Sequence, residues 1–195
     1  MKKAKILGEP IDFDSLAVTE RITEGMWVAQ IAKGQKNGWG LVVRESRNGR
    51  YILAISFLYD AIRKIGANLF ETKFDHGSYE KFGLHDLSRG VLIDPGTDLR
   101  CSTGFTLLTP RIVRNGDQFL SLVTLKWTEL DTTELRGSIV RAEPVPSGAG
   151  FKKDLFLIIL SPYDSHQKDK KVVIFDAATG KVIMEGTTAA PSAEI

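Results

Sequence analysis

The stretch MWVAQIAKGQKNGWGLVVRESRNGRYILAIS, residues 26–56, decides the fold class. It holds three apolar or alternating runs, about 27–32, 39–45 and 50–56, with Asn37-Gly38 and Asn48-Gly49 between them. Asn-Gly between such runs is a strong hairpin signal, because both residues accept a positive φ at low cost. The stretch therefore predicts a meander of three antiparallel strands.

The segment after the meander carries apolar residues at helical spacing. They fall four, three and four residues apart, and they are Leu58, Ile62, Ile65 and Leu69. This spacing predicts one amphipathic helix over residues 57–70. We expect it to end near residue 70, because Gly66 and Asn68 have low helix propensity.

The rest of the chain is predicted to be mostly strands. Residues 71–90 show no period and contain three glycines, so they are interpreted as part strand, short helical turn or functional loop. Asn115-Gly116 predicts a further hairpin between residues 111–114 and 119–127. With the runs near 91–93, 105–108, 135–142, 155–160, 172–175 and 182–184, the sequence predicts about ten strands. The expected fold class is mainly β, as antiparallel sandwich or barrel-like sheets with one helix.

The length of 195 residues fits one ordinary domain. We expect a single β-rich domain over residues 1–195. The alternative is a division into a meander plus helix over 1–70 and an all-β unit over 91–186. The tail, residues 187–195, has no pattern and is expected to be disordered unless a partner orders it.

Composition gives weak constraints on function. The chain has 26 Lys and Arg against 24 Asp and Glu, a net charge of +2 that requires no polyanionic partner. The single Cys101 excludes an intramolecular disulfide and multi-cysteine zinc sites. The longest apolar run, residues 155–160, is far shorter than the about 20 residues of a membrane helix. With no signal peptide expected, we predict a cytoplasmic protein, with a virion or signal-independent export as open alternatives.

No catalytic or metal-binding pattern emerges. His76 and His85 lie nine residues apart and His166 is distant, which matches neither helical nor strand spacing for a metal site. We interpret the histidines near residues 76–85 as solvated loop residues. The chain also lacks Gly-x-Ser-x-Gly. We therefore expect no catalytic residues, no metal and no cofactor, and we do not expect an enzyme.

One segment has a local charge excess. Residues 33–64 contain seven basic and two acidic side chains, a net +5, with aromatic residues between them. Aromatic rings and cations on a sheet are typical of proteins that bind single-stranded nucleic acid. The candidate nucleic-acid-binding residues are Lys33, Lys36, Trp39, Arg44, Arg47, Arg50, Tyr51, Arg63 and Lys64. The competing interpretation is that these charges occupy the solvated face and edge of a sheet.

Two functions follow as hypotheses. The first is a non-catalytic structural or binding protein, a homo-oligomer or a partner of another protein, that acts through contacts on a β scaffold. It rests on the many strands, whose sheet edges and aromatic residues suit association. The alternative is a single-stranded nucleic-acid-binding protein that uses the basic and aromatic residues of 33–64.

Overall fold

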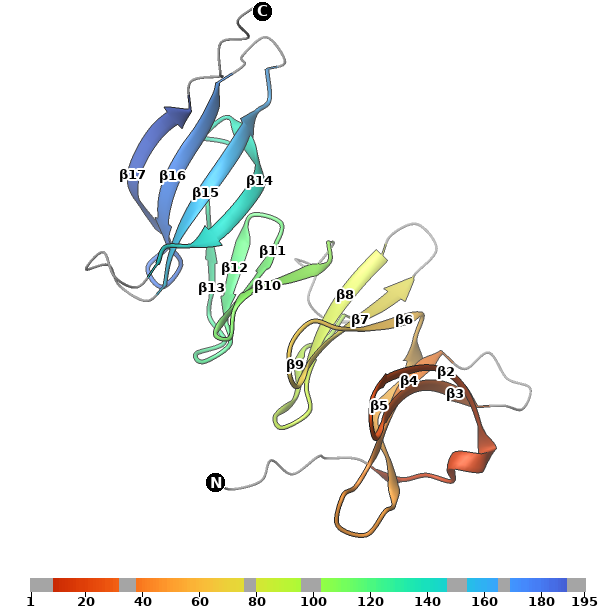
Figure 1. Ribbon diagram of the computed structural model, residues 1–195. Coiled ribbons are helices and arrows are strands. Elements are labelled where there is room, and N and C mark those ends of the chain that lie inside the picture. The colour runs from red at the N-terminus through yellow and green to blue at the C-terminus, as the bar shows by residue number, and fades with distance from the viewer. Residues whose placement is uncertain are drawn as a thin grey trace, which may run out of the picture. The chain divides into compact units, whose positions relative to one another are not determined.

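The computed structural model describes residues 9–31, 38–75, 80–95, 103–146, 154–164 and 169–188. Its strands, β1 to β17, form four antiparallel sheets (Figure 1). Within these residues no helix reaches seven residues and none of the sheets closes into a barrel. The predicted mainly β, antiparallel fold class is thus confirmed, with more strands than expected and without barrel closure.

The chain divides into two compact units, Met1–Phe105 and Thr106–Ile195. The boundary follows Phe105. It therefore lies later in the chain than the division suggested from the sequence, which ends the first unit at residue 70 and begins the second at residue 91. The single domain over residues 1–195 and its alternative division stay predictions.

The first unit contains two sheets. The first sheet has the order β1-β5-β4-β3-β2, and the second sheet has the order β6-β7-β8-β9. The first sheet consists of β1 (Glu9–Pro10), β2 (Leu16–Thr23), β3 (Met26–Ile31), β4 (Trp39–Arg44) and β5 (Tyr51–Tyr59), with a short 3-10 helix, η1 (Phe13–Ser15), before β2. The second sheet consists of β6 (Ala61–Lys64), β7 (Leu69–Asp75), β8 (Glu80–Asp86) and β9 (Gly90–Ile93).

The predicted meander is confirmed as β3, β4 and β5. The strands pair antiparallel in chain order, and Gly49 in the β4–β5 turn has a φ of +69°. One apolar cluster draws on both sheets of this unit, with Val28, Leu41 and Ile55 from the first sheet and Phe70 from the second. The meander therefore supplies one wall of a core.

The predicted helix over 57–70 is wrong. This segment contains the end of β5, all of β6 and the start of β7, and β6 and β7 pair antiparallel. The N–H groups of Ile65 and Gly66 both donate to the carbonyl of Leu69, at 3.0 and 3.1 Å, and close the turn between the strands.

The physical reason lies in turn chemistry and in side-chain burial. Gly66 and Asn68 favour a turn, and the β-branched residues before them favour a strand. The apolar stripe also fails as a face, because Leu58 is 64% exposed whereas Ile62 and Leu69 are buried on two different strands. The helical spacing was therefore coincidental.

Residues 71–90 are largely strand. They hold most of β7 and all of β8, and a turn leads into β9, so the interpretation as part strand is confirmed. Residues 76–79 lie outside the described residues.

The second unit also contains two sheets, the first strand of which begins at the last residue of the first unit, Phe105. The third sheet consists of β10 (Phe105–Thr109), β11 (Ile112–Asn115), β12 (Gln118–Ser121) and β13 (Trp127–Glu129), in chain order. The fourth sheet consists of β14 (Gly137–Pro144), β15 (Leu155–Pro162), β16 (Lys170–Asp176) and β17 (Lys181–Thr188), also in chain order (Figure 1). The hairpin predicted at Asn115-Gly116 is confirmed, although its second strand ends at Ser121. Residues 187–188 of the predicted tail belong to β17, and residues 189–195 lie outside the described residues.

Three phenylalanines join the two sheets of the second unit. Phe119 of the third sheet lies with its ring centroid 4.8 Å from that of Phe175 and 5.8 Å from that of Phe156, both in the fourth sheet. All three side chains are fully buried. Loss of such a ring typically costs about 3–5 kcal/mol, so this cluster contributes substantially to the stability of the unit.

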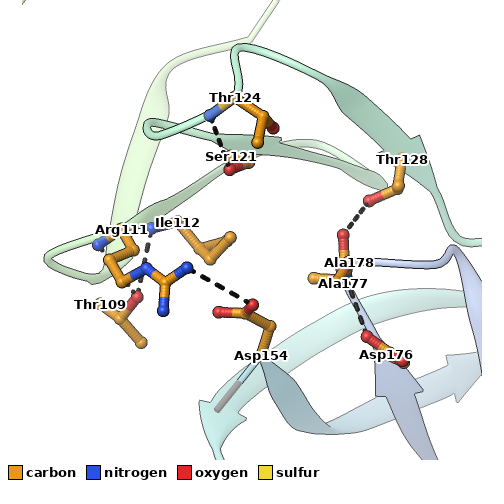
Figure 2. Close-up of polar contacts among 10 residues, drawn as sticks. All are labelled: Thr109, Arg111, Ile112, Ser121, Thr124, Thr128, Asp154, Asp176, Ala177 and Ala178. Carbon is orange, nitrogen blue, oxygen red and sulfur yellow. Dashed lines mark hydrogen bonds and ion pairs between the residues drawn. The ribbon is translucent and has the colours of Figure 1, made fainter. Parts of the chain in front are cut away.

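Polar contacts fix the same two sheets at their ends (Figure 2). The hydroxyl of Thr128 in β13 donates to the carbonyl of Ala177 at 2.7 Å. The guanidinium of Arg111 lies 3.9 Å from the carboxylate of Asp154, just before β15. Together they join the third and fourth sheets at the margin of the apolar core.

Candidate functional site

The predicted nucleic-acid-binding residues do not form one cluster among the described residues. Lys33 and Lys36 lie outside the described part of the chain. Of the rest, four lie close in sequence at the β4–β5 turn and its flanks, and two of these, Arg44 and Tyr51, pair across the ladder; the four are Arg44, Arg47, Arg50 and Tyr51. Trp39 begins β4 and packs against the apolar core of the first unit. Arg63 and Lys64 belong to β6 in the other sheet.

Arg63 has a structural role. Its guanidinium pairs with the buried carboxylate of Glu71 at 3.0 Å and donates to the carbonyl of Phe105 at 3.1 Å. The other carboxylate oxygen of Glu71 accepts a hydrogen bond from the backbone N–H of Phe105. A buried carboxylate needs such partners, so Arg63 is committed to holding Glu71 in place.

Three aromatic rings meet beside Arg44. Phe13 of η1 stacks on Tyr51 with ring centroids 4.2 Å apart, and its centroid lies 5.0 Å from that of Trp27. Trp27 and Tyr51 are 5.6 Å apart. The guanidinium carbon of Arg44 lies 5.9 Å from the centroid of Tyr51, within range of a cation–π contact. We call Phe13, Trp27 and Tyr51 the aromatic cluster.

Strand alternation explains why these rings meet. Val28 and Val43 point into the core, so Trp27 on β3 and Arg44 on β4 point to the opposite face. Arg44 pairs with Tyr51 across the β4–β5 ladder, which puts the tyrosine on this face as well. The first sheet thus carries an aromatic face opposite its core face.

A short N-terminal segment brings Phe13 onto that face. The N–H of Ile11 donates to the carbonyl of Tyr51 at 3.0 Å, so the segment is attached to β5. Asp12 then caps η1 by accepting a hydrogen bond from the N–H of Asp14 at 3.2 Å. These bonds position the ring of Phe13 over the sheet.

Two grooves flank the aromatic cluster. The smaller groove, about 410 Å³, is lined by Pro10, Ile11, Asp12, Phe13, Asp14, Arg50 and Tyr51. The larger groove, about 660 Å³, is lined by Arg21, Glu24, Gly25, Trp27, Arg44, Glu45, Ser46 and Gly49. The two linings together contain three arginines and four carboxylates. The net +5 of the sequence segment is therefore not reproduced around the rings.

His85 corrects the interpretation of solvated loop histidines. It lies on β8, is buried, and makes an edge contact with the ring of Tyr59 at 5.3 Å. Burial lowers the pKa of His85 to about 4, and the carboxylate of Asp94 opposes this shift only in part. His76 and His166 lie outside the described residues. Histidine 85 is thus a neutral core residue at pH 7.

The described part of the chain holds neither a metal-binding cluster nor a membrane-spanning helix. No group of three His, Cys, Asp or Glu side chains is placed to hold a metal ion there. No helix in that part is long and apolar enough to span a membrane.

The second unit has an apolar face of its own. Val173 and Phe175 of β16 belong to the core, so Val172 and Ile174 point to the opposite face. Ladder pairing places further apolar residues beside them, in the rows Leu157–Ile174–Met184 and Ile159–Val172–Gly186. We call Leu157, Ile159, Val172, Ile174 and Met184 the outer face of the fourth sheet.

The edge strand β17 is open to solvent on both sides. All eight of its residues are exposed, and Met184 is exposed by 59%. No described residue of the second unit's apolar core lies on the outer face. An apolar sheet face of this kind is typical of an interaction surface.

Sequence reasoning missed part of both surfaces. Phe13 was not assigned to any element, although the Asp12-Phe13-Asp14 pattern carries a capping residue. Trp27 was assigned to a strand, and its alternation with Val28 was the signal that it faces away from the core. The outer face was missed because the uninterrupted apolar run at 155–160 has no polar alternation to distinguish its two faces.

Comparison of the sequence with models of known protein families gives no match, and comparison with curated proteins gives none either.

Proposed function

We propose that this protein is a non-catalytic β protein that assembles with copies of itself through the outer face of the fourth sheet. The observation that carries the proposal is the continuous apolar row from Leu157 through Ile174 to the exposed Met184. Apolar area that stays in water costs about 25 cal/mol per Å² relative to burial. A second copy presents the same apolar surface, as a two-fold interface requires.

Contact through the face is favoured over contact through the edge of β17. The β16–β17 ladder has a bulge, in which Ile183 has no partner on β16. Bulges twist an edge strand, and charged residues such as Lys181 and Glu185 oppose pairing with another edge. The sheets would then pack face to face, in the manner of a sandwich.

Light scattering after size exclusion tests the proposal. We expect the wild-type protein to be larger than 21.6 kDa at micromolar concentration and the Met184→Asp variant to be monomeric. Val123→Asp is the matched control, because Val123 has the same exposed fraction, 59%, but lies outside the outer face. A monomeric wild type, or equal effects of the two substitutions, would contradict the proposal.

The nucleic-acid alternative keeps one supporting contact, Arg44 over the ring of Tyr51. Its measurement is fluorescence anisotropy with a labelled oligothymidine at low and high salt, since phosphate contacts release counterions. Binding that weakens with salt and on replacement of Arg47 and Arg50 by Glu would favour this function. The cytoplasmic location of the protein also stays a prediction.

A further inference from the structure

The aromatic cluster separates two grooves on the first unit, and this arrangement has no part in assembly through the fourth sheet. Phe13 and Tyr51 line the smaller groove, whereas Trp27 and Arg44 line the larger one. Their volumes, about 410 and 660 Å³, both lie in the range of ligand sites, about 300–1,000 Å³. A ligand long enough to cross the cluster would contact both.

The rings are available to such a ligand. Phe13, Trp27 and Tyr51 are each only partly buried, although they contact one another. Partly exposed aromatic side chains offer a flat apolar surface with little conformational entropy to lose on binding. The apolar C–H faces of sugar rings and the faces of nucleobases both stack on this kind of surface.

The charges distinguish between these two ligands. Arg21, Arg44 and Arg50 are accompanied by four carboxylates, from Asp12, Asp14, Glu24 and Glu45, which gives the two linings a net charge of −1. A phosphate backbone needs an excess of cations, and these carboxylates would repel it. A hydroxyl group, in contrast, both donates and accepts, so it can bond a carboxylate and a guanidinium side by side.

We propose that the paired grooves bind a neutral oligosaccharide, stacked on the aromatic cluster and hydrogen-bonded through its hydroxyls to the arginines and carboxylates of the rims. Arg44 has two functions in this site. It lies over Tyr51 and keeps the ring in place, and it is exposed, so its guanidinium can donate to sugar hydroxyls in the larger groove. The binding needs no second copy of the chain.

A glycan array of neutral and charged oligosaccharides, followed by calorimetry with the strongest hit, tests the site. We expect neutral glycans to bind and the Arg44→Gln variant to bind about tenfold more weakly, the loss expected for a hydrogen bond from a charged donor. Arg47→Gln is the matched control, because Arg47 is exposed in the same turn but lines neither groove. A glycan that stacks on Trp27 should change the tryptophan fluorescence of the protein. The Trp27→Phe variant should not show this change.

Three results would overturn the proposal. They are no binding to any neutral glycan, equal loss in the Arg44→Gln and Arg47→Gln variants, and binding of an oligothymidine in place of glycans. The Met184→Asp variant separates this proposal from the assembly proposal. Its glycan binding should equal that of the wild type, whether or not the wild type is an oligomer.

Discussion

The first and fourth sheets both have apolar or aromatic side chains on two faces, but only the first is partly covered by a segment of its own chain. Phe13, delivered by a helix of three residues, packs on Trp27 and Tyr51. On the fourth sheet, the row that ends at Met184 has no such cover among the described residues. In the proposed assembly, a second copy would give the fourth sheet the cover that Phe13 partly gives the first.

The largest expected effect is a loss of stability in acid, and it tests whether the first unit unfolds in acid before the second. An unfolded histidine titrates near 6.5, whereas the pKa of the buried His85 is lowered to about 4. The unfolded chain therefore binds the extra proton first, and stability that is complete above pH 6.5 is lost as the pH falls toward 4. Between about pH 7 and about pH 4.5 the first unit should lose about 2.4 kcal/mol of unfolding free energy.

Urea unfolding followed by fluorescence measures this loss. In a Trp127→Phe variant the remaining tryptophans, Trp27 and Trp39, report on the first unit alone. His85→Gln should remove most of the pH dependence. Equal acid sensitivity of the second unit, followed through Trp127 in a variant with Trp27→Phe and Trp39→Phe, would break the comparison.

The next effect concerns the cover itself. Phe13→Ala removes the ring from the aromatic cluster and should lower the free energy of unfolding by about 2 kcal/mol, because the ring is partly rather than fully buried. Trp27 emission should shift to the red as water reaches the indole. Phe13→Leu, which keeps most of the apolar volume, should cost less than about 1 kcal/mol. No difference between these variants would show that Phe13 is not a cover.

The smallest expected effect comes from a substitution on the outer face of the fourth sheet. Met184→Thr should change the unfolding free energy of the monomer by less than about 0.5 kcal/mol, because the side chain is mostly exposed. The measurement is urea unfolding at several protein concentrations. A cost above about 1 kcal/mol that is independent of concentration would mean that the chain covers this face itself.

The sequence predicted hairpins well because their signals are local. Asn48-Gly49 and Asn115-Gly116 mark real turns, and Gly49 and Gly116 have φ values of +69° and +61°. The helix over 57–70 failed because apolar residues at spacings of three and four also occur when two strands flank a turn. Only the pairing of β6 with β7 distinguishes the two cases, and pairing is not a local property.

The candidate site was predicted in part. The sequence placed Arg44 and Tyr51 in one set, and the structure places them together. It could not exclude Arg63, because the partners of that side chain, Glu71 and Phe105, follow 8 and 42 residues later. Phe13 was missed for the same reason, since its contacts come from β3 and β5.

The bulge at Ile183 has a consequence for the size of any assembly. The other edge of the sheet is β14, so head-to-tail pairing of β17 with β14 of the next copy would propagate without limit. Face-to-face packing buries the outer face of both copies, so no further copy can add at that surface. If the protein assembles as proposed, a twisted β17 would thus favour a closed particle of fixed stoichiometry over a growing filament.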